Sequence, residues 1–315
     1  MPNPHLLIRP LLRREAVKSS RIEGTRTTLS ELLLEEARQQ RSEDSDMREV
    51  RNYVNALEHG IGLLPNLPLS LRFVREIHAQ LMSGAQSAHV TPGEFRLSQN
   101  WIGPAGSTPT TATYVPPPVE EMTELLADWE RYLHVRDQVP DLVQCAVMHE
   151  HFEAIHPFLD GNGRVGRLLV TLFLIERSRL SQPLLYLSDF IERHREDYYA
   201  LLLAVRTRGE WAPWIRYFLA GVTETATAAA QSAQSLMSLR EQMVRVTDVR
   251  LVDRLFANPF ITAPAAATAM DVSLPTARKA LRALEAKGIL VEQSKRKWGQ
   301  YFVAKGILSI VERTP

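Results

Sequence analysis

The segment at 156–167, HPFLDGNGRVGR, gathers one imidazole, one carboxylate, one amide, three glycines and two arginines within twelve positions. A phosphate-binding turn that leads into a helix would account for most of these residue types. Gly161 and Gly163 let the backbone approach an anion closely, and the unpaired N–H groups that open a helix favour negative charge. Arg164 and Arg167, three positions apart on the first helical turn, could then hold two different phosphates through bidentate contacts.

Three further side chains in this segment suit nucleotide chemistry. Asn162 can donate a hydrogen bond to a phosphoryl oxygen. The Asp160 carboxylate is a hard oxygen ligand suited to the Mg²⁺ that accompanies polyphosphates. His156 titrates near neutral pH and can accept a proton from an attacking hydroxyl. A polar loop with capping glycines, the plainest alternative, would leave the imidazole, the carboxylate and both arginines without a role.

Two other interpretations of the region fit less well. Gly161, Gly163 and Gly166 satisfy the G-x-G-x-x-G pattern of dinucleotide-binding proteins, but that pattern needs a preceding strand, and the residues before it have helical spacing. A metal site is the other interpretation, because the candidate ligands His149, Glu150, His151, Glu153 and His156 lie close together and His149 and Glu153 share a helix face. Yet the H-E-x-x-H pattern is absent from the sequence, and the side chains of His149 and His151 diverge on a helix. We therefore expect both histidines to be hydrogen-bonded structural residues.

The whole segment resembles the signature of the Fic family, H-x-F-x-[D/E]-G-N-G-R-x-x-R. Upstream, GEFR at 93–96, NWIG at 100–103 and YVPPP at 114–118 look like the family's flap hairpin and the turn after it. The resemblance covers residues 11–220 or so. It implies protein adenylylation, in which AMP moves from ATP to a hydroxyl side chain of a target protein and pyrophosphate leaves.

The resemblance also implies a role for each residue of the signature. His156 would be the general base for the incoming Tyr, Thr or Ser hydroxyl, and Asp160 would hold the Mg²⁺ that bridges the α- and β-phosphates. Arg164 would hold the β-phosphate and Arg167 the γ-phosphate, while Phe158 would anchor the loop in the core. The full set of expected ATP contacts in the signature is Gly161, Asn162, Gly163, Arg164, Val165, Gly166 and Arg167. Phosphoryl-type transfer needs mainly positioning and charge neutralisation, which these residues can supply.

The flap is expected to be a hairpin of two short strands around GPAGSTPT at 103–110, where Pro, Gly and Thr replace helical spacing. An extended target segment could add to it as a strand and align its hydroxyl with the α-phosphate. A local mini-core is an alternative that is compatible with the same role. The flap residues expected beside the target are Trp101, Ile102, Gly103 and Tyr114.

A second motif, SSRIEG at 19–24, lies near the N-terminus. Ser19 and Glu23 are four positions apart and face the same way on a helix, and Gly24 puts Glu23 at or near the helix end. An ion pair between Glu23 and Arg167 would take space and charge that the γ-phosphate needs. The motif resembles the family's inhibitory sequence, [S/T]-x-x-x-E-[G/N]. The alternative is a solvated glutamate, which the helix dipole disfavours at a C-terminus.

Two tyrosines follow the signature on a predicted helix, in EDYYALL at 196–202. The resemblance suggests that one aromatic side chain there borders the nucleotide, and we choose Tyr198 over Tyr199. Packing of both tyrosines in the core is the alternative.

The C-terminal residues differ in charge from the rest of the chain. From Val249 onward there are 11 Lys+Arg and 5 Asp+Glu, against 26 and 31 before it. Two short helices joined by a turn, followed by a hairpin that turns at Trp298 and Gly299, resemble a winged helix. The candidate nucleic-acid contacts are Arg278, Lys279 and Arg282 on the second helix and Lys295, Arg296 and Lys297 on the wing. A winged helix that mediates only protein contacts is an equal alternative.

The spacing of apolar residues predicts a mainly α protein with helices over 11–40, 47–61, 70–82, 119–133, 141–155, 165–180 and 195–221. The resulting architecture is a Fic helical bundle with a β-hairpin flap, plus a C-terminal winged helix-turn-helix of α+β type. The expected parts are an N-terminal segment with the inhibitory helix (1–45), a Fic catalytic core (46–221), a helical linker (222–248) and a winged helix domain (249–315).

Composition sets the remaining expectations. Apolar residues make up 45% of the chain and charged residues 23%, as in an ordinary soluble protein. The single Cys145 excludes an internal disulfide and is expected to be a buried, inert thiol. The start of this sequence shows no signal-peptide pattern and no segment is long enough to span a bilayer, so we expect a cytoplasmic protein that does not act at a membrane.

The sequence therefore predicts Mg²⁺-dependent transfer of AMP from ATP to Tyr, Thr or Ser hydroxyls of a target protein or of this protein itself, held low at rest by Glu23. One alternative is a DNA-binding regulator whose Fic core is a sensor or modifies itself. Another is a family variant that uses a different phosphoryl donor or removes AMP. The family likeness also suggests a homodimer, with a nucleic acid as a further candidate partner of the C-terminal domain.

Overall fold

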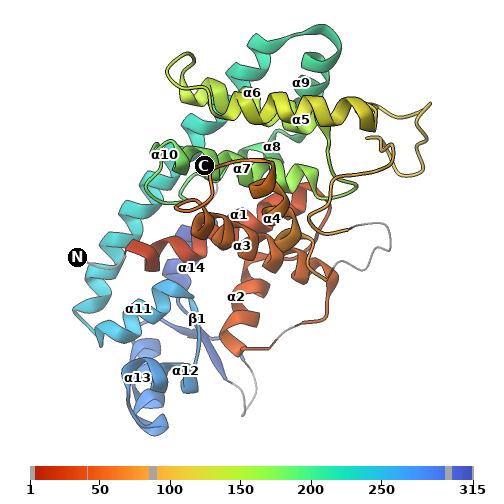
Figure 1. Cartoon of the computed structure of the whole chain (residues 1–315). Helices are drawn as coiled ribbons and strands as arrows, with labels where there is room; N and C mark the ends of the chain where they lie inside the picture. The colour runs from red at the N-terminus through yellow and green to blue at the C-terminus, as the bar shows by residue number, and fades with distance from the viewer. Residues whose placement is uncertain (1–3, 41, 85–90, 295–299, 314–315) are drawn as a thin grey trace.

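The computed structural model describes residues 4–40, 42–84, 91–294 and 300–313, and most of them are helical (Figure 1). The predicted mainly α fold is confirmed. The N-terminal helices are α1 (Pro4–Ile22), α2 (Leu29–Arg38), α3 (Ser45–Leu63) and α4 (Leu71–Leu81). After the flap come α5 (Val119–Leu133), α6 (Asp141–Ile155), α7 (Asn162–Glu176), α8 (Leu187–Arg193), α9 (Arg195–Arg208) and α10 (Trp211–Val244).

The chain breaks between α1 and α2, where the sequence had predicted one helical stretch over 11–40. Gly24 has φ +110°, a left-handed conformation that ends α1. Thr28 then starts α2 with a capping box: its hydroxyl accepts from the Glu31 N–H, and the Glu31 carboxylate accepts from the Thr28 N–H at 2.8 Å. The prediction of continuous helix over 11–40 was wrong here, although Gly24 had already indicated a helix end near Glu23; the capping box at Thr28 is the signal that was not used. The break leaves Glu23 at the end of α1.

Helix α7 lies in the middle of the bundle, packed against α6, α3, α4 and α1 (Figure 1). Its residues are buried along nearly the whole length, as the almost continuous apolar sequence predicted. A helix buried on all sides has a fixed position, so the glycine-containing turn at its N-terminus is held by the core of the protein.

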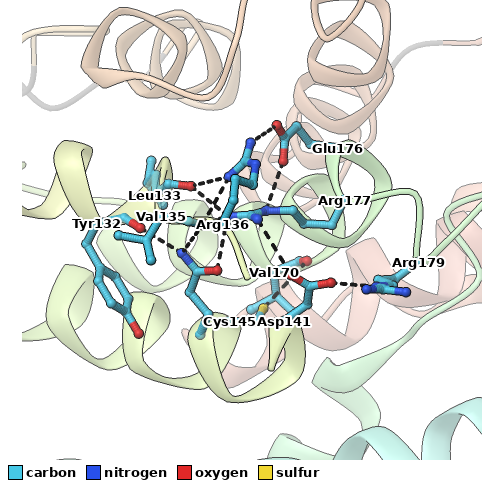
Figure 2. Close-up of polar contacts among 11 residues, drawn as sticks. Tyr132, Leu133, Val135, Arg136, Asp141, Cys145, Val170, Glu176, Arg177 and Arg179 are labelled. Atoms are coloured by element: carbon cyan, nitrogen blue, oxygen red, sulfur yellow. Dashed lines mark hydrogen bonds and ion pairs between the residues drawn. The ribbon is translucent and has the colours of Figure 1, made fainter. Parts of the chain in front are cut away.

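Polar contacts hold the start of α6 and the end of α7 against the segment that follows α5 (Figure 2). The Arg177 guanidinium follows α7 and donates to the carbonyl oxygens of Leu133 and Val135, both at 2.8 Å, and to the Gln144 amide oxygen at 3.0 Å. It also lies 3.6 Å from the Asp141 carboxylate at the start of α6. The network sets the register between α6 and α7 at the ends that point away from residues 156–167. Cys145, in the same region, is buried as expected.

Helix α10 continues without interruption through residues 222–244, which the sequence had assigned to a helical connector. It packs against α6, α8 and α9 at one end and against α11 and α14 at the other (Figure 1). The helix therefore joins the bundle rigidly to the C-terminal elements.

The C-terminal unit consists of α11 (Val249–Ala257), β1 (Phe260–Thr262), α12 (Ala263–Met270), α13 (Leu274–Ala286), β2 (Val291–Glu292), β3 (Tyr301–Val303) and α14 (Lys305–Glu312). Its antiparallel sheet has the order β1-β3-β2, with Ile261 opposite Phe302 and Val291 opposite Val303. The two predicted helices joined by a turn are present as α12 and α13. The predicted turn at Trp298 and Gly299 lies outside the described residues.

Candidate active site

A cavity of about 650 Å³ opens where the end of α1, the turn between α6 and α7, helix α9 and the flap meet. Most of the residues that the sequence singled out for chemistry converge on it. Those that line the cavity are Glu23, Trp101, Ile102, Gly103, Tyr114, His156, Asp160, Gly163, Arg167 and Tyr198. Residues separated by more than a hundred positions are thus brought to one site.

His156 ends α6 in a left-handed conformation, with φ 50°. Two buried side chains upstream hold the backbone that follows it. Arg96 donates from Nε to the His156 carbonyl at 3.0 Å, and Asn100 donates from Nδ2 to the carbonyls of His156 and Phe158 at 3.1 and 2.8 Å. Sequence reasoning placed both residues in the flap region and missed this role.

Phe158 anchors the turn in the core, as expected: it is fully buried and stacks on His78 with ring centroids 3.6 Å apart. The Asn162 side chain closes the same turn, because its Oδ1 accepts from the Phe158 N–H and its Nδ2 donates to the Phe158 carbonyl, both at 2.8 Å. The amide that the sequence assigned to a phosphoryl oxygen is therefore engaged by the protein backbone. Asn162 does not line the cavity.

The first turn of α7 needs glycine at two positions. Gly161 has φ +80° at the N-terminal cap of α7, where a side chain would be strained. A Cβ added at Gly163 would lie 2.5 Å from Glu23 Oε1 and 3.0 Å from Arg167 Nη1. The absence of a side chain thus lets a carboxylate, or an anion in its place, approach the start of the helix closely.

The ion pair predicted between Glu23 and Arg167 is present, with 2.6 Å between Glu23 Oε1 and Arg167 Nη2. Ser19 supports it from the same helix, because Arg167 Nε donates to the Ser19 hydroxyl at 2.8 Å and Nη2 to the Ser19 carbonyl at 3.0 Å. Burial would raise the pKa of the Glu23 carboxyl, but the Arg167 guanidinium more than offsets this and keeps the pKa below its ordinary value. Glu23 is therefore ionised at neutral pH.

Arg164 lies outside the cavity lining. Its buried guanidinium pairs with Glu49 at 2.6 Å and approaches the Asp160 carboxylate at 3.6 Å. Asp160 itself is exposed at the rim, where it accepts from the Gly161 N–H at 2.6 Å. A single carboxylate beside a helix N-terminus is compatible with Mg²⁺, which proteins usually hold through one or two carboxylates together with substrate phosphates and water. Within the described ranges, no group of three or more His, Cys, Asp or Glu side chains could hold a metal by itself.

The His156 imidazole is arranged as a base. Burial lowers its pKa to about 4, and the nearby Arg206 guanidinium adds to the effect, so the ring is neutral at pH 7. Its Nδ1 lies 3.3 Å from the Glu153 carbonyl. Because a carbonyl oxygen can only accept, this contact places the hydrogen on Nδ1 and leaves the Nε2 lone pair available.

Two further charged residues line the cavity: Glu153, which the sequence offered only as a candidate metal ligand, and Arg206, which it did not single out. Glu153 lies one helical turn before His156 and is fully buried, which raises the pKa of its carboxyl to about 7. Arg206 on α9 pairs with Glu150 at 3.2 Å and places its guanidinium 4.5 Å from the centre of the Tyr114 ring. The spacing of Glu153 to the signature was a usable signal, whereas Arg206 could be found only from the folded chain.

Both tyrosines of α9 border the cavity, but they differ in exposure. Tyr198 is 1% exposed and its hydroxyl lies 2.8 Å from His149 Nε2, whereas Tyr199 is 41% exposed. The contact confirms the interpretation of His149 as a hydrogen-bonded structural residue. His151 instead meets the Trp211 ring edge-on at 5.2 Å.

The flap contains a single rung of sheet among the described residues. Ile102 and Tyr114 exchange backbone hydrogen bonds at 2.8 and 3.1 Å. The predicted hairpin of two strands was wrong in this respect, because local turns take the intervening backbone groups, as in the bond from the Ser107 N–H to the Pro104 carbonyl at 3.0 Å. Trp101, 42% exposed, stands at the cavity mouth.

This combination of a helical bundle, a glycine turn at a buried helix and a flap over one cavity defines a Fic-type protein. Residues 1–62 match the Fic/DOC family N-terminal region and residues 68–174 match the Fic/DOC family. The chain belongs to the Fic/DOC family. Among the helices that the structure describes, none is long and apolar enough to cross a membrane.

Curated relatives include the protein adenylyltransferase Fic of Drosophila erecta, 28% identical over 178 residues, which are 55% of this chain and 30% of that protein. The Drosophila grimshawi protein of the same name is 28% identical over 177 residues, 55% of this chain and 31% of that protein. The chain thus spans less than a third of the length of these relatives.

Two solved structures resemble the fold. A Fic family protein from Desulfovibrio desulfuricans G20 has a TM-score of 0.59 at 22% identity and covers 94% of this chain and 87% of its own. A Fic domain containing signaling protein from Bacteroides thetaiotaomicron VPI-5482 has a TM-score of 0.60 at 20% identity, and the match covers 74% of this chain and 92% of that one. At these identities the likeness concerns the fold.

Proposed function

We propose that this protein is a protein adenylyltransferase that moves AMP from ATP to a Tyr, Thr or Ser hydroxyl of a target protein or of itself. The observation that carries the proposal is the convergence of a neutral His156, the glycine turn that opens α7, and Arg167 on one cavity. The activity named for the Drosophila relatives supports the same class of reaction.

The residues suggest how the transfer would proceed. The target hydroxyl attacks the α-phosphorus of ATP, its proton passes to His156 Nε2, and the bond to the β-phosphate breaks so that pyrophosphate leaves. Gly161 and Gly163 let the phosphates approach the N–H groups at the start of α7. Asp160 would hold Mg²⁺, which supplies charge neutralisation on the phosphates when it is bound. Arg167 would bind the γ-phosphate, and Arg164, if it exchanged Glu49 for substrate, the β-phosphate.

The Glu23 carboxylate would act as a brake on this reaction. It occupies the guanidinium that the γ-phosphate would use, at 2.6 Å, and it lies against Gly163 where the anion would enter. Ser19 holds the guanidinium in the same orientation. ATP must therefore displace a charge-assisted hydrogen bond in order to bind with its phosphates in line.

The flap would present the target. Ile102 and Tyr114 form its one rung, and Trp101 and Gly103 border the cavity next to them. An extended target segment could pair with this edge and bring a hydroxyl toward His156. Arg206, stacked on Tyr114, would keep the flap close to α9. Tyr198 would border the nucleotide from the far side of the cavity.

Labelling with ATP that carries a labelled α-phosphate tests the proposal in the presence of Mg²⁺. Wild type should label weakly, Glu23→Gly strongly, and Glu23→Gly with His156→Ala not at all. Glu43→Gly, at an exposed position in a loop, controls for a glycine replacing a glutamate and should behave as wild type. No labelling of any variant that still binds ATP would rule out adenylyl transfer. Transfer from another phosphoryl donor, or removal of AMP, would then be the better proposal. Release of label from a target protein that already carries labelled AMP would detect the removal reaction.

A second candidate function concerns the C-terminal unit, for which we propose a winged helix domain at 249–315. Its element order, with a helix pair followed by two antiparallel strands, and the exposed Arg278 and Lys279 on α13 favour contact with nucleic-acid phosphates. Arg282 is less available, because it pairs with Glu285 at 2.6 Å and with Glu292 at 2.8 Å. The wing residues Lys295, Arg296 and Lys297 lie outside the described residues.

Salt-dependent binding of duplex DNA to the full chain would support the regulator function, and its loss in Lys279→Gln would locate it. Retention of labelling activity in that variant would keep transfer as the primary function. A homodimer and a cytoplasmic location complete the proposal, and sedimentation and cell fractionation would test them.

A further inference from the structure

A second cavity, of about 780 Å³, lies between the end of α2 and the C-terminal unit. None of its lining residues borders the cavity that contains His156. One wall comes from residues 37–40 at the end of α2, and the opposite wall comes from α11, α12, α13 and the ends of the strands. Neither the signature nor the inhibitory motif accounts for this cavity.

The lining is strongly basic. Arg38, Arg254 and Arg278 reach it from three different helices, and none of the lining residues that the structure describes is acidic. The other polar groups there are neutral, from glutamine, threonine and serine side chains. Arginine side chains from three helices around one cavity can provide the planar, bidentate donors that phosphate oxygens bind best.

Arg254 is the member of the set that most needs an anion. Its side chain is half-buried, and burial lowers the pKa of the guanidinium. Glu36 opposes this shift, but the Glu36 carboxylate already accepts from Arg13 at 3.0 Å, while Arg9 adds further positive charge nearby. A partly desolvated cation with an opposing carboxylate that is already shared gains free energy when an anion enters.

The walls of the cavity are held together without a ligand. Buried Asn258, next to β1, donates from Nδ2 to the Leu33 carbonyl of α2 at 2.8 Å. The Arg38 guanidinium lies 4.6 Å from the centre of the Tyr301 ring of β3. Helix α2 consequently stands beside β1 as a fixed wall (Figure 1). Small-molecule sites are usually preformed in this way, with volumes of roughly 300–1,000 Å³.

We propose that this cavity is a second anion site, which binds a small polyphosphate of nucleotide size through Arg38, Arg254 and Arg278. Its volume suits a molecule of that size. The site is separate from the ATP site in position and in residues, so it stands whether or not the protein transfers AMP.

Titration calorimetry of the full chain with inorganic tripolyphosphate tests the proposal. Arg38→Gln and Arg278→Gln change exposed residues and should fold normally, and each should weaken the tripolyphosphate affinity by about tenfold or more. Arg254→Gln should weaken it further. Arg216→Gln, an exposed arginine on α10 that lines neither cavity, is the matched control and should leave the affinity unchanged.

Three results would overturn the proposal. The first is an absence of tripolyphosphate binding at low salt. The second is binding that is equally tight in Arg38→Gln, Arg278→Gln and wild type, since the anion would then be bound elsewhere. The third is duplex DNA binding that these substitutions abolish while tripolyphosphate does not bind at all, because the basic surface would then be a nucleic-acid contact.

Discussion

Replacing Glu23 should raise the affinity for ATP and lower the free energy of unfolding, and the contacts of Glu23 allow the size of both effects to be estimated. The carboxylate forms a charge-assisted hydrogen bond of 2.6 Å to Arg167, whose side chain is 2% exposed. Such bonds contribute about 1.5–3 kcal/mol, so removing the competitor should raise ATP affinity by about 10- to 100-fold. Glu23→Gln keeps the shape and removes the charge, whereas Glu23→Gly, the released variant, removes both.

The same substitution leaves Arg167 without its carboxylate. A fully buried cation that loses its partner costs about 3–5 kcal/mol, but the Glu23 side chain is 34% exposed and water can reach the guanidinium from the cavity. We therefore expect a loss of about 1–3 kcal/mol in the free energy of unfolding, which lowers Tm by about 2–4 °C per kcal/mol. Saturating ATP should restore most of the loss, because its γ-phosphate replaces the missing charge.

Calorimetric binding of ATP with Mg²⁺, together with melting curves with and without ATP, measures both effects in one set of proteins. Ser19→Ala is the control, because it removes the 2.8 Å bond from Arg167 to the Ser19 hydroxyl without changing any charge. It should tighten ATP binding by less than Glu23→Gln does. A Glu23→Gln protein that melts lower but binds ATP no more tightly than wild type would refute the competition between carboxylate and γ-phosphate.

Three further predictions concern individual side chains. Burial and Arg206 hold the pKa of His156 at about 4, so kcat/KM of the Glu23→Gly variant should stay constant from about pH 8 to about pH 5.5. Adding Arg206→Gln should move the acid side of this pH profile to higher pH. A fall in kcat/KM centred at about pH 6.5 in Glu23→Gly alone would contradict this prediction. Asn162→Ala should lower the free energy of unfolding by about 2–3 kcal/mol, because two hydrogen bonds to the Phe158 backbone are lost, and the KM for ATP should change little. A large rise in the KM for ATP without a fall in Tm would instead indicate that Asn162 contacts a phosphate. Burial raises the pKa of Glu15 from 4.5 to about 7, so the folded protein holds a proton that the unfolded chain releases, and it loses stability as pH rises through this range. The Tm of Glu15→Gln should therefore increase relative to that of wild type from about pH 5 to about pH 8. A Tm difference that stays constant over this range would show that the carboxyl does not titrate there.

The parts of the site that could be predicted are those in which neighbouring residues of one short segment carry the relevant functional groups. The segment at 156–167 specified a turn, a helix start and a base, and the geometry of the glycines follows from it directly. The pair between Glu23 and Arg167 joins residues 144 positions apart. It was predictable only because each belongs to a short motif with a recognisable partner.

Roles that depend on which of several partners a polar group meets could not be predicted. The Asn162 amide suits a phosphate as well as a backbone carbonyl, and only the folded turn shows that Phe158 occupies it. Arg206 has no neighbouring motif, and its place beside Tyr114 depends on how α9 packs. The flap strands failed for a related reason, since Thr, Pro and Gly satisfy one another locally instead of pairing across the hairpin.

Helix α1 ends at Ile22, directly before Glu23, and also packs against α11 and α14 of the C-terminal unit, as well as α8 and α10. One rigid body is thus shared between the two ends of the molecule. Thermodynamic linkage then applies: any ligand of the C-terminal unit that favours a displaced α1 must tighten ATP binding, and ATP must tighten the binding of that ligand by the same factor. If the proposed nucleotide site and brake are correct, the C-terminal unit and that site would be coupled through the position of α1, and either would report on the occupancy of the other.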